Sequence, residues 1–411
     1  ANWAVNYYKD RFGEELGTNP QQLAICYTER LSRDYPFLNY YGRIMALADN
    51  QIRLMDKATL EPDSITPYLL GEHYANFMTP YPVPDVSTYK PEWINEVIGG
   101  TRMQIAYNSL YNNNFFMQIG GGRFYTMNHY TLGSSRATVN NQSPYTDGYI
   151  SPFGYWDDMS NYESYGTNMY LGCYTGDFIM FDRNNHRFFY GSGYGGRTSI
   201  EEQDVPSYPQ YDNLLWGSAT VIENNTSVAI LNSGDNCRMI VLQNGKGGTT
   251  GTRDTKKLVK EIDCNGVVSA ESKFYMMKYN TYLFFTNGDK LYRYNLLNGI
   301  NSNMGPANTP ILSLSELGYG PEAKITSMFV SRSEQTLLLG VSRYGNDSEA
   351  AGEEAKGDVL WFDLNASTLE IKYNENRSAK GVAGIPVDVK IKFQTLWRDG
   401  KNYQEELVDQ Y

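Results

Sequence analysis

The sequence has few of the residues that bind metal ions or act as bases in catalysis. Only 3 of its 411 residues are histidine: His73, His129 and His186. They show no HExxH pattern or paired metal spacing, and the GxSxG motif of serine hydrolases is absent. We therefore interpret the histidines as ordinary polar residues.

Cysteine is also scarce, with four residues: Cys26, Cys173, Cys237 and Cys264. No two of them form a CxxC pair or show the spacing of a zinc site, so a structural zinc ion is not indicated. We expect buried free thiols in preference to disulfides, although the spacing alone leaves both states open.

Long apolar runs and concentrated basic charge are missing too. No run approaches the roughly 18 to 20 apolar residues that span a bilayer. The 35 basic residues are scattered among 46 acidic ones, giving a net charge of −11. Nucleic acid is excluded as an expected partner, because phosphate binding needs clustered Lys and Arg. The opening ANWAVNYYKDRFG lacks the features of a signal peptide, so we expect any export signal or lipid-carrying cysteine to lie outside this chain.

The sequence is rich in the residues of strands and turns. It holds 35 Tyr and 38 Gly, and its β-branched and aromatic residues form short runs between clusters of Gly, Asn and Asp. Such residues favour strands and tight turns respectively. The composition therefore predicts an all-β fold.

One pattern recurs along the chain: two β-rich runs joined by a short polar turn. The turn centres lie near residues 49, 121, 176, 235, 288 and 350. A spacing of about 60 residues predicts a β-propeller of about seven long blades, with six or eight as alternatives. No linker divides the chain, so we predict a single domain over residues 1–411.

Six hairpins are clear, and the seventh blade must be assembled from both chain ends. We expect strands at residues 23–27 and 387–393 to close the ring, which would remove exposed sheet edges. The dipeptide Asn287-Gly288 predicts a type I′ turn. Residue 19 could begin one helical turn, and residues 313–318 read as a short capped helix that ends at Gly318.

Residues 191–196 match GxGxxG, the dinucleotide-binding pattern. That motif must lie between a strand and a helix, and the residues after Gly196 read as a loop. Adjacent acids such as Glu201 and Glu202 are interpreted as solvated loop charge, since adjacency does not place two carboxylates across a sugar. We therefore predict no cofactor.

The loop at residues 343–357 is acidic and rich in oxygen ligands. It lacks the alternation of an EF-hand, so calcium is only an alternative interpretation. The candidate ligands are Asn346, Asp347, Glu349 and Glu353.

Two irregular segments, residues 143–165 and 207–216, are dense in aromatic side chains. Flat rings beside carboxylates suit a glycan or peptide ligand, because they provide contact area at low entropic cost. The alternative is that these rings fill gaps between blades. The candidate ligand-binding residues are Tyr149, Tyr155, Trp156, Asp157, Asp158, Tyr162, Tyr165, Tyr208 and Tyr211.

The C-terminal third resembles a known family. AKITSMFVS from Ala323, LLLGVSRYGND from Leu337, GDVLWFD from Gly357 and GVAGIPVDVKIK from Gly381 are similar to the PKD-like lipoproteins of Bacteroidetes. GRIMALADN from Gly42 is similar to the first blade of that family. The resemblance is good from about residue 310 onward and loose before it.

This resemblance implies a propeller region preceded by immunoglobulin-like domains, which are absent from this chain. It also implies a lipoprotein at the outward face of the outer membrane, in loci with SusC/SusD-like transporters. The family has no defined motif for catalysis or ligand binding, so no residue role follows from it.

The sequence leaves three functional hypotheses. The first is a non-enzymatic surface scaffold of a SusCD-type, TonB-dependent nutrient importer that captures a glycan or peptide through its loop aromatics. The second is a propeller-type polysaccharide lyase or glycosidase, which needs opposed carboxylates or a Tyr/Arg/His set. The third is a purely structural subunit of an import complex. We predict the first.

Overall fold

The computed structural model describes much of the chain, in two compact units. The described residues are 7–30, 39–56, 60, 91–97, 114–119, 123–128, 150–153, 162–168, 177–194, 197–202, 205–217, 226–243, 257–277, 281–331, 334–346, 355–382, 384–391, 394–395 and 407–408. One unit comprises residues 11–203, and the other residues 1–10 and 204–411. The prediction of a single domain stays a prediction.

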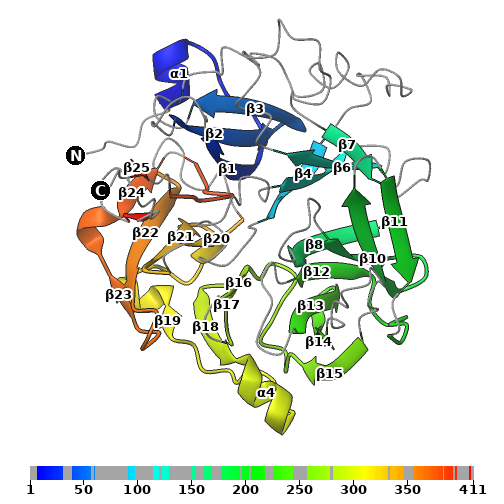
Figure 1. Ribbon diagram of the computed structural model, residues 1–411. Coiled ribbons are helices and arrows are strands. Elements are labelled where there is room, and N and C mark those ends of the chain that lie inside the picture. Colours follow the sequence, from blue (N-terminus) through cyan, green and yellow to red (C-terminus); the bar gives the residue numbers. More distant parts are fainter. Residues whose placement is uncertain are drawn as a thin grey trace, which may run out of the picture. The chain divides into compact units, whose positions relative to one another are not determined.

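The described residues of the unit 11–203 form three antiparallel sheets, ordered β1-β2-β3, β4-β5-β6-β7 and β11-β10-β9-β8 (Figure 1). Strand β4 runs beside β1 and β8. The short helix α1 (Tyr7–Phe12) spans the division between the units. The strands are β1 (Pro20–Arg30), β2 (Asn39–Ala48), β3 (Gln51–Asp56), β4 (Pro91–Val97), β5 (Asn114–Ile119), β6 (Arg123–Asn128), β7 (Ile150–Phe153), β8 (Tyr162–Asn168), β9 (Asp177–Asp182), β10 (Arg187–Tyr194) and β11 (Arg197–Glu202).

A type I′ turn joins β2 to β3, at the position that the sequence predicts. Asp49 and Asn50 both have positive φ, as this turn requires. The Asp49 carboxylate accepts hydrogen bonds from the backbone N–H groups of Thr18 and Asn19, at 2.8 Å each. These bonds lower the pKa of Asp49 and tie the start of β1 to the turn.

In the second unit, the described strands form three more antiparallel sheets and one two-stranded ladder. The sheets are ordered β12-β13-β14-β15, β16-β17-β18-β19 and β20-β21-β22-β23, with β24 also paired to β22. The strands are β12 (Asn213–Gly217), β13 (Thr226–Ser233), β14 (Asn236–Gln243), β15 (Lys257–Asp263), β16 (Phe274–Met276), β17 (Tyr282–Asn287), β18 (Lys290–Asn295), β19 (Leu312–Ser313), β20 (Lys324–Val330), β21 (Thr336–Ser342), β22 (Gly357–Leu364), β23 (Ile371–Tyr373), β24 (Ala379–Val382), β25 (Gln394–Thr395) and β26 (Leu407–Val408).

Consecutive sheets of this unit pack face to face. One apolar cluster joins the β12–β15 sheet to the β16–β19 sheet, and a second joins the β16–β19 sheet to the β20–β24 sheet. Phe285 illustrates the first cluster, because its ring lies 5.0 Å from that of Tyr292 and 6.3 Å from that of Phe274. Alternate residues of β17 and β18 point to opposite faces, so the middle sheet is buried on both.

The predicted all-β fold is confirmed, and so are the strand pairs of most predicted hairpins. Strands β5–β6, β13–β14, β17–β18 and β21–β22 pair where the sequence places them. The third predicted hairpin has its turn centre near residue 176. Strand β8 (Tyr162–Asn168) precedes that turn and pairs with β9, and residues 169–176 lie outside the described residues. The number of blades stays a prediction.

The turn between β17 and β18 differs in type from the prediction. Its central residues are Gly288 and Asp289, and only Gly288 has positive φ, at 58°. That pattern is typical of a type II′ turn, in which the first central residue must adopt the left-handed region. Gly234 and Asp235 repeat it between β13 and β14, with φ of 56° at Gly234.

Three short helices lie between described strands of the second unit, and one of them, the 3-10 helix η5 (Glu375–Arg377), joins β23 to β24. The 3-10 helix η4 (Leu314–Leu317) ends at Gly318 in the left-handed conformation, as predicted for residues 313–318. Helix α4 (Leu296–Ser302) was missed, although Asn295 caps it by accepting from the Asn298 N–H. The predicted helical turn at residue 19 is wrong, because Pro20 begins β1.

The predicted strand at residues 387–393 is also wrong over residues 387–391. This segment is not in a sheet. Pro386 and Val389 pack over Gly340 of β21, where a Cβ would lie 2.9 Å from the Pro386 Cβ. The Thr326 hydroxyl donates to the Pro386 carbonyl. The apolar alternation that suggested a strand therefore covers a sheet face instead of extending the sheet.

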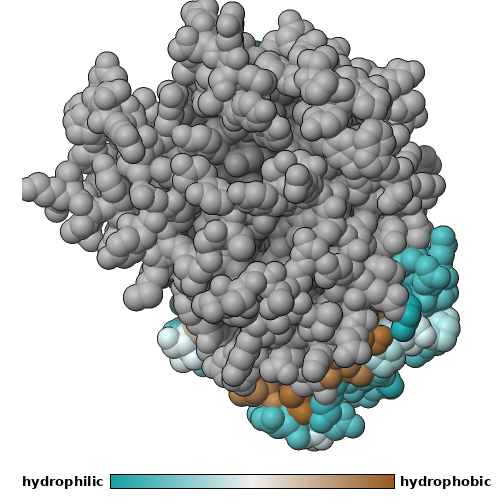
Figure 2. Space-filling view, turned by 45° about the vertical axis from the view of Figure 1, so that its right-hand side comes forward, coloured by the Kyte–Doolittle hydropathy of each residue, from teal (hydrophilic) through white to brown (hydrophobic). Residues whose placement is uncertain are grey.

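The surface in Figure 2 is mainly hydrophilic over the described residues, with a smaller hydrophobic group among them. Met304 and Val387 are the exposed large hydrophobic side chains of the described chain. Among these residues, no helix is both long enough and apolar enough to cross a membrane.

Candidate functional site

Polar side chains from three segments meet at one end of the β20–β24 sheet. Because neighbouring strands are antiparallel, the start of β20, the end of β21 and the start of β22 lie at the same end. Tyr319 precedes β20, Arg343 follows β21, and Asp358 is the second residue of β22. We call Tyr319, Arg343 and Asp358 the Asp358 cluster.

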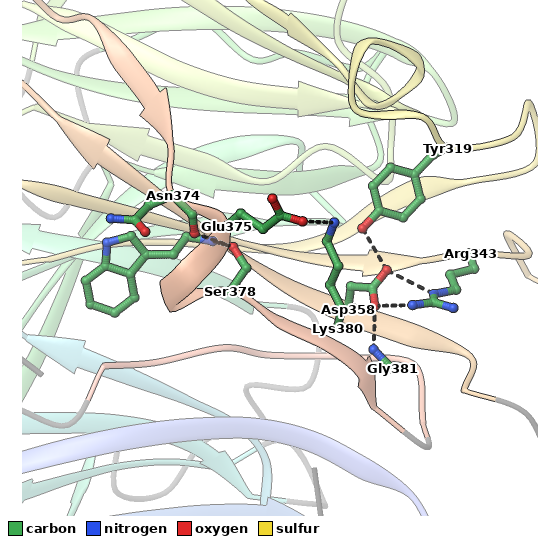
Figure 3. A network of polar contacts seen from close by, with 9 residues as sticks. Tyr319, Arg343, Asp358, Asn374, Glu375, Ser378, Lys380 and Gly381 are labelled. Carbon is green, nitrogen blue, oxygen red and sulfur yellow. Dashed lines mark hydrogen bonds and ion pairs between the residues drawn. The ribbon is translucent and has the colours of Figure 1, made fainter. Parts of the chain in front are cut away.

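Asp358 is the centre of this cluster and is only 1% exposed. Its Oδ1 accepts from Arg343 Nη2 at 2.7 Å, and its Oδ2 accepts from Arg343 Nε at 3.0 Å (Figure 3). The Tyr319 hydroxyl donates to Oδ2 at 2.6 Å, and the Gly381 N–H donates to Oδ1 at 2.6 Å. Four donors thus satisfy a buried carboxylate, in the bidentate geometry that suits arginine.

The contacts determine the charge state of each member. Burial raises the pKa of Asp358, but the hydrogen bonds from Arg343, Tyr319 and Gly381 outweigh it and lower the pKa below its usual value. The bond to Asp358 raises the pKa of Arg343. Burial and the Asp358 carboxylate raise the pKa of Tyr319, so its phenol keeps its proton at neutral pH. Tyr319 is therefore a donor here and not a base.

Arg343 is the accessible member of the cluster. Its side chain is 33% exposed, and Nη1 makes no hydrogen bond to a described residue. Since Asp358 neutralises most of the guanidinium charge, Arg343 can act chiefly through directed N–H donors. Such donors suit carboxylate or hydroxyl oxygens of a ligand.

A second polar group extends along the same sheet in Figure 3. Lys380 lies 3.6 Å from the Glu375 carboxylate, and the Ser378 hydroxyl donates to the Asn374 carbonyl at 2.8 Å. Ser378 in turn accepts from the backbone N–H of Trp361 at 2.9 Å. Lys380 and Glu375 are exposed, whereas Ser378 is buried. The contacts of this group fasten β23, the 3-10 helix η5 (Glu375–Arg377) and β24 to β22.

Most of the predicted ligand-binding residues belong to segments other than the described ones. Tyr149, Tyr155, Trp156, Asp157 and Asp158 lie outside the described residues. Tyr162 and Tyr165 are on β8, opposite Asp182 and Ile179, but their side chains are not described.

Tyr208 and Tyr211 are described, and both are core residues. Tyr208 is 1% exposed and Tyr211 5%. Burial raises the pKa of both phenols, and Glu261 adds to this effect at Tyr208. These two rings fill the interior beside the β12–β15 sheet, which was the alternative interpretation of the aromatic segments.

The predicted calcium loop is also mostly outside the described residues. Asn346 is exposed in the turn after β21, whereas Asp347, Glu349 and Glu353 are not described. Within the described part of the chain, no group of three His, Cys, Asp or Glu side chains is placed to hold a metal ion.

The GxGxxG pattern lies in a sheet. Strands β10 and β11 pair from Tyr194 and Arg197 onward, so a strand follows the motif where a dinucleotide site needs a helix. The residues after Gly196, which the sequence predicts to be a loop, form strand β11. The pattern therefore lacks the helix that a dinucleotide-binding site requires at this point.

Sequence reasoning missed the Asp358 cluster, although a signal for it was present. The dipeptide Gly-Asp precedes or opens the third strand of each sheet in the second unit, at Gly234-Asp235, Gly288-Asp289 and Gly357-Asp358. In each case the Asp accepts hydrogen bonds from a neighbouring segment: from Ala270 N–H at Asp235, from the Ser313 hydroxyl at Asp289, and from the donors described above at Asp358.

No family model and no curated protein matches the chain. Several solved structures are similar. A protein from Lactobacillus plantarum is 8% identical, with a TM-score of 0.41, over 89% of this chain and 98% of that one. A putative 6-phosphogluconolactonase from Bacteroides fragilis is 9% identical, with a TM-score of 0.42, over 90% and 83%. A post-proline cleaving enzyme from Rickettsia typhi is 8% identical, with a TM-score of 0.39, over 89% and 46%.

These findings contradict the prediction of a non-enzymatic surface scaffold. Two of the three structures named above carry enzyme names. The prediction that the chain is not an enzyme is unsupported for the same reason. At these identities and TM-scores, the activities of those proteins are not transferred to this chain.

Proposed function

We propose that the chain is a β-propeller enzyme that cleaves a polysaccharide, with the Asp358 cluster as its candidate site. The observation that carries the proposal is the convergence of Tyr319 and Arg343, from two separate segments, on the buried, ionised carboxylate of Asp358. Ionisable groups that are perturbed by burial and by a specific charged partner mark candidate functional sites.

The propeller part of the proposal rests on the second unit. Its three consecutive antiparallel sheets pack face to face through two apolar clusters, and each sheet is contiguous in sequence. This is the arrangement of neighbouring propeller blades.

The composition of the cluster favours a lyase over a glycosidase. A glycosidase needs two carboxyl groups that flank the glycosidic bond, whereas this cluster holds a single carboxylate, already bonded to Arg343. A lyase removes a proton next to a uronate carboxylate, and donors aimed at that carboxylate stabilise the charge that develops on it. Arg343 would supply these donors, with Asp358 and Tyr319 positioning it. The base would come from another residue.

The proposal is tested by incubating the full chain with a panel of acidic and neutral polysaccharides. A lyase produces unsaturated ends that absorb in the ultraviolet, and a glycosidase produces new reducing ends without that absorbance. We expect the first product on an acidic polysaccharide. Arg343→Lys should lower kcat/KM by about 10- to 100-fold, because Lys cannot reproduce the directed donors.

Arg293→Lys is the matched control, since Arg293 is an exposed arginine of β18 that donates to the Leu369 carbonyl outside the cluster. It should leave kcat/KM unchanged. Absence of cleavage on every substrate would overturn the proposed function. Cleavage that Arg343→Lys does not alter would mean that the Asp358 cluster only stabilises the fold.

From the family resemblance we also propose an outward-facing location at the outer membrane and SusC/SusD-like transporters as partners. An outward-facing outer-membrane protein should be released by protease treatment of intact cells. If it associates with SusC/SusD-like transporters, they should co-purify with it from detergent-solubilised outer membranes.

A further inference from the structure

Two free, buried cysteines lie where strands β14 and β15 of the second unit pair, one in β14 and one directly after β15. Strands β14 and β15 pair antiparallel, with Arg238 opposite Asp263 and Met239 opposite Ile262. One further step along this register brings Cys237 opposite Cys264, the residue that follows β15. A hydrogen bond from Val267 N–H to the Cys264 carbonyl fixes the chain at this point.

Both thiols point to the same face of the sheet and are buried there. Cys237 and Cys264 belong to the apolar cluster between the β12–β15 and β16–β19 sheets, together with Met239 and Ile262. Cys237 is 6% exposed and Cys264 1%. Burial and, after it, the charge of the Cys237 thiolate raise the pKa of Cys264, which agrees with the closeness of the two groups.

This placement fits the geometry of a disulfide. Opposite residues of an antiparallel pair have Cα atoms about 4.5 to 5.5 Å apart, and disulfides join Cα atoms about 4.4 to 6.8 Å apart. We propose that Cys237 and Cys264 are an oxidation site and close to a disulfide across β14 and β15 in the presence of a disulfide oxidant.

The reaction is an ordinary thiol–disulfide exchange. The Cys237 thiolate attacks one sulfur of the oxidant, which forms a mixed disulfide and releases one oxidant thiol. The Cys264 thiolate then attacks the Cys237 sulfur and releases the second thiol. The protein loses two electrons and two protons, and the oxidant gains them.

Burial slows this exchange in the folded protein. It raises the pKa of the Cys237 thiol to about 11, and it raises the pKa of Cys264 further. Since the thiolate is the reacting species, both groups are largely protonated at neutral pH. The bond should therefore form fastest during folding, before the apolar cluster closes over the two sulfurs.

The test uses the full chain with Cys26→Ala and Cys173→Ala, which leaves only the two cysteines in question. The protein is refolded in oxidised and reduced glutathione, alkylated in denaturant, digested and analysed by mass spectrometry. We expect one linked peptide pair whose mass is two hydrogens below the sum of its parts. Closing a loop of this length should also raise Tm by about 5 to 10 °C over the reduced form.

Adding Cys237→Ala to this background is the matched control. It should give no linked pair and no rise of Tm on oxidation. The proposal fails if the refolded protein, shown by circular dichroism to be folded, carries both cysteines as alkylated thiols or as separate glutathione adducts. It also fails if the linked pair forms but Tm falls, because the native register would then not accommodate the bond.

Discussion

The hydrogen-bond partners of single side chains determine whether a charged group can be buried in this protein. Asp358 could not remain ionised at 1% exposure without its four donors, since an uncompensated buried charge costs several kcal/mol, about 3 to 5 in typical cases. Tyr208 and Tyr211 show what the sequence does not reveal about a single side chain. Their aromatic density was visible in the sequence, but whether a ring faces a ligand or the core depends on which sheet covers it.

Asp358→Asn should lower the free energy of unfolding by about 2 to 3 kcal/mol at pH 7. The substitution leaves Arg343 without its carboxylate, although the partial exposure of Arg343 limits the loss. The folded-state pKa of Asp358 is lowered, so its stabilisation is complete above the unfolded pKa of about 4 and is lost as the pH falls through the folded value.

Urea unfolding at pH 7 and pH 3 measures both effects. The difference between the wild type and the variant should shrink at the lower pH. Asp363→Asn, at an exposed position of the same strand, is the control and should cost less than about 1 kcal/mol at either pH. A difference that grows on acidification would contradict the assignment of an ionised Asp358.

At the scale of elements, turn chemistry made the strands predictable. Two β-rich runs around Asp49-Asn50 or Asn287-Gly288 leave few alternatives to a hairpin, because Gly and Asn are among the few residues that accept positive φ. The predictions were wrong where one sequence pattern is compatible with two kinds of local structure. Residues 387–391 alternate like a strand but lie over Gly340, and only the missing side chain of that glycine on a neighbouring strand makes room for them.

Phe285→Ala should lower the free energy of unfolding by about 3 to 5 kcal/mol, because it leaves a cavity between two sheets that are packed on each other. Thermal or urea unfolding gives the value. Met304→Ala is the control at an exposed position, with an expected change within about 0.5 kcal/mol. A loss below about 1 kcal/mol for Phe285→Ala would mean that the cluster is not a tightly packed core.

For the whole molecule, composition was sufficient to predict an all-β chain and insufficient to predict its activity. The strand content follows from residue types that favour strands, whereas the Asp358 cluster depends on which segments the topology brings to one end of a sheet. Three of its contacts join residues 15, 23 and 39 positions apart in sequence. No local pattern shows that they meet.

Residues 204–391, expressed alone, should fold into a β-rich unit that unfolds cooperatively. Both apolar clusters lie within this segment, so its core does not depend on the remainder of the chain. Far-ultraviolet circular dichroism and a urea titration test this. A broad, non-cooperative transition would show that the sheets need the rest of the chain, as a single closed domain requires.

The contiguity of each sheet in the sequence has a consequence for synthesis on the ribosome. Every strand of the second unit pairs with strands near it along the chain, so each sheet can form once its own residues have emerged. The β12–β15 sheet would form first and offer its apolar face to β16–β19, and the other face of β16–β19 would then receive β20–β24. Chains rich in local contacts fold quickly, and domains emerge N-terminal part first. Assembly would then proceed sheet by sheet, and a stall in translation would leave a partly built stack with one uncovered face.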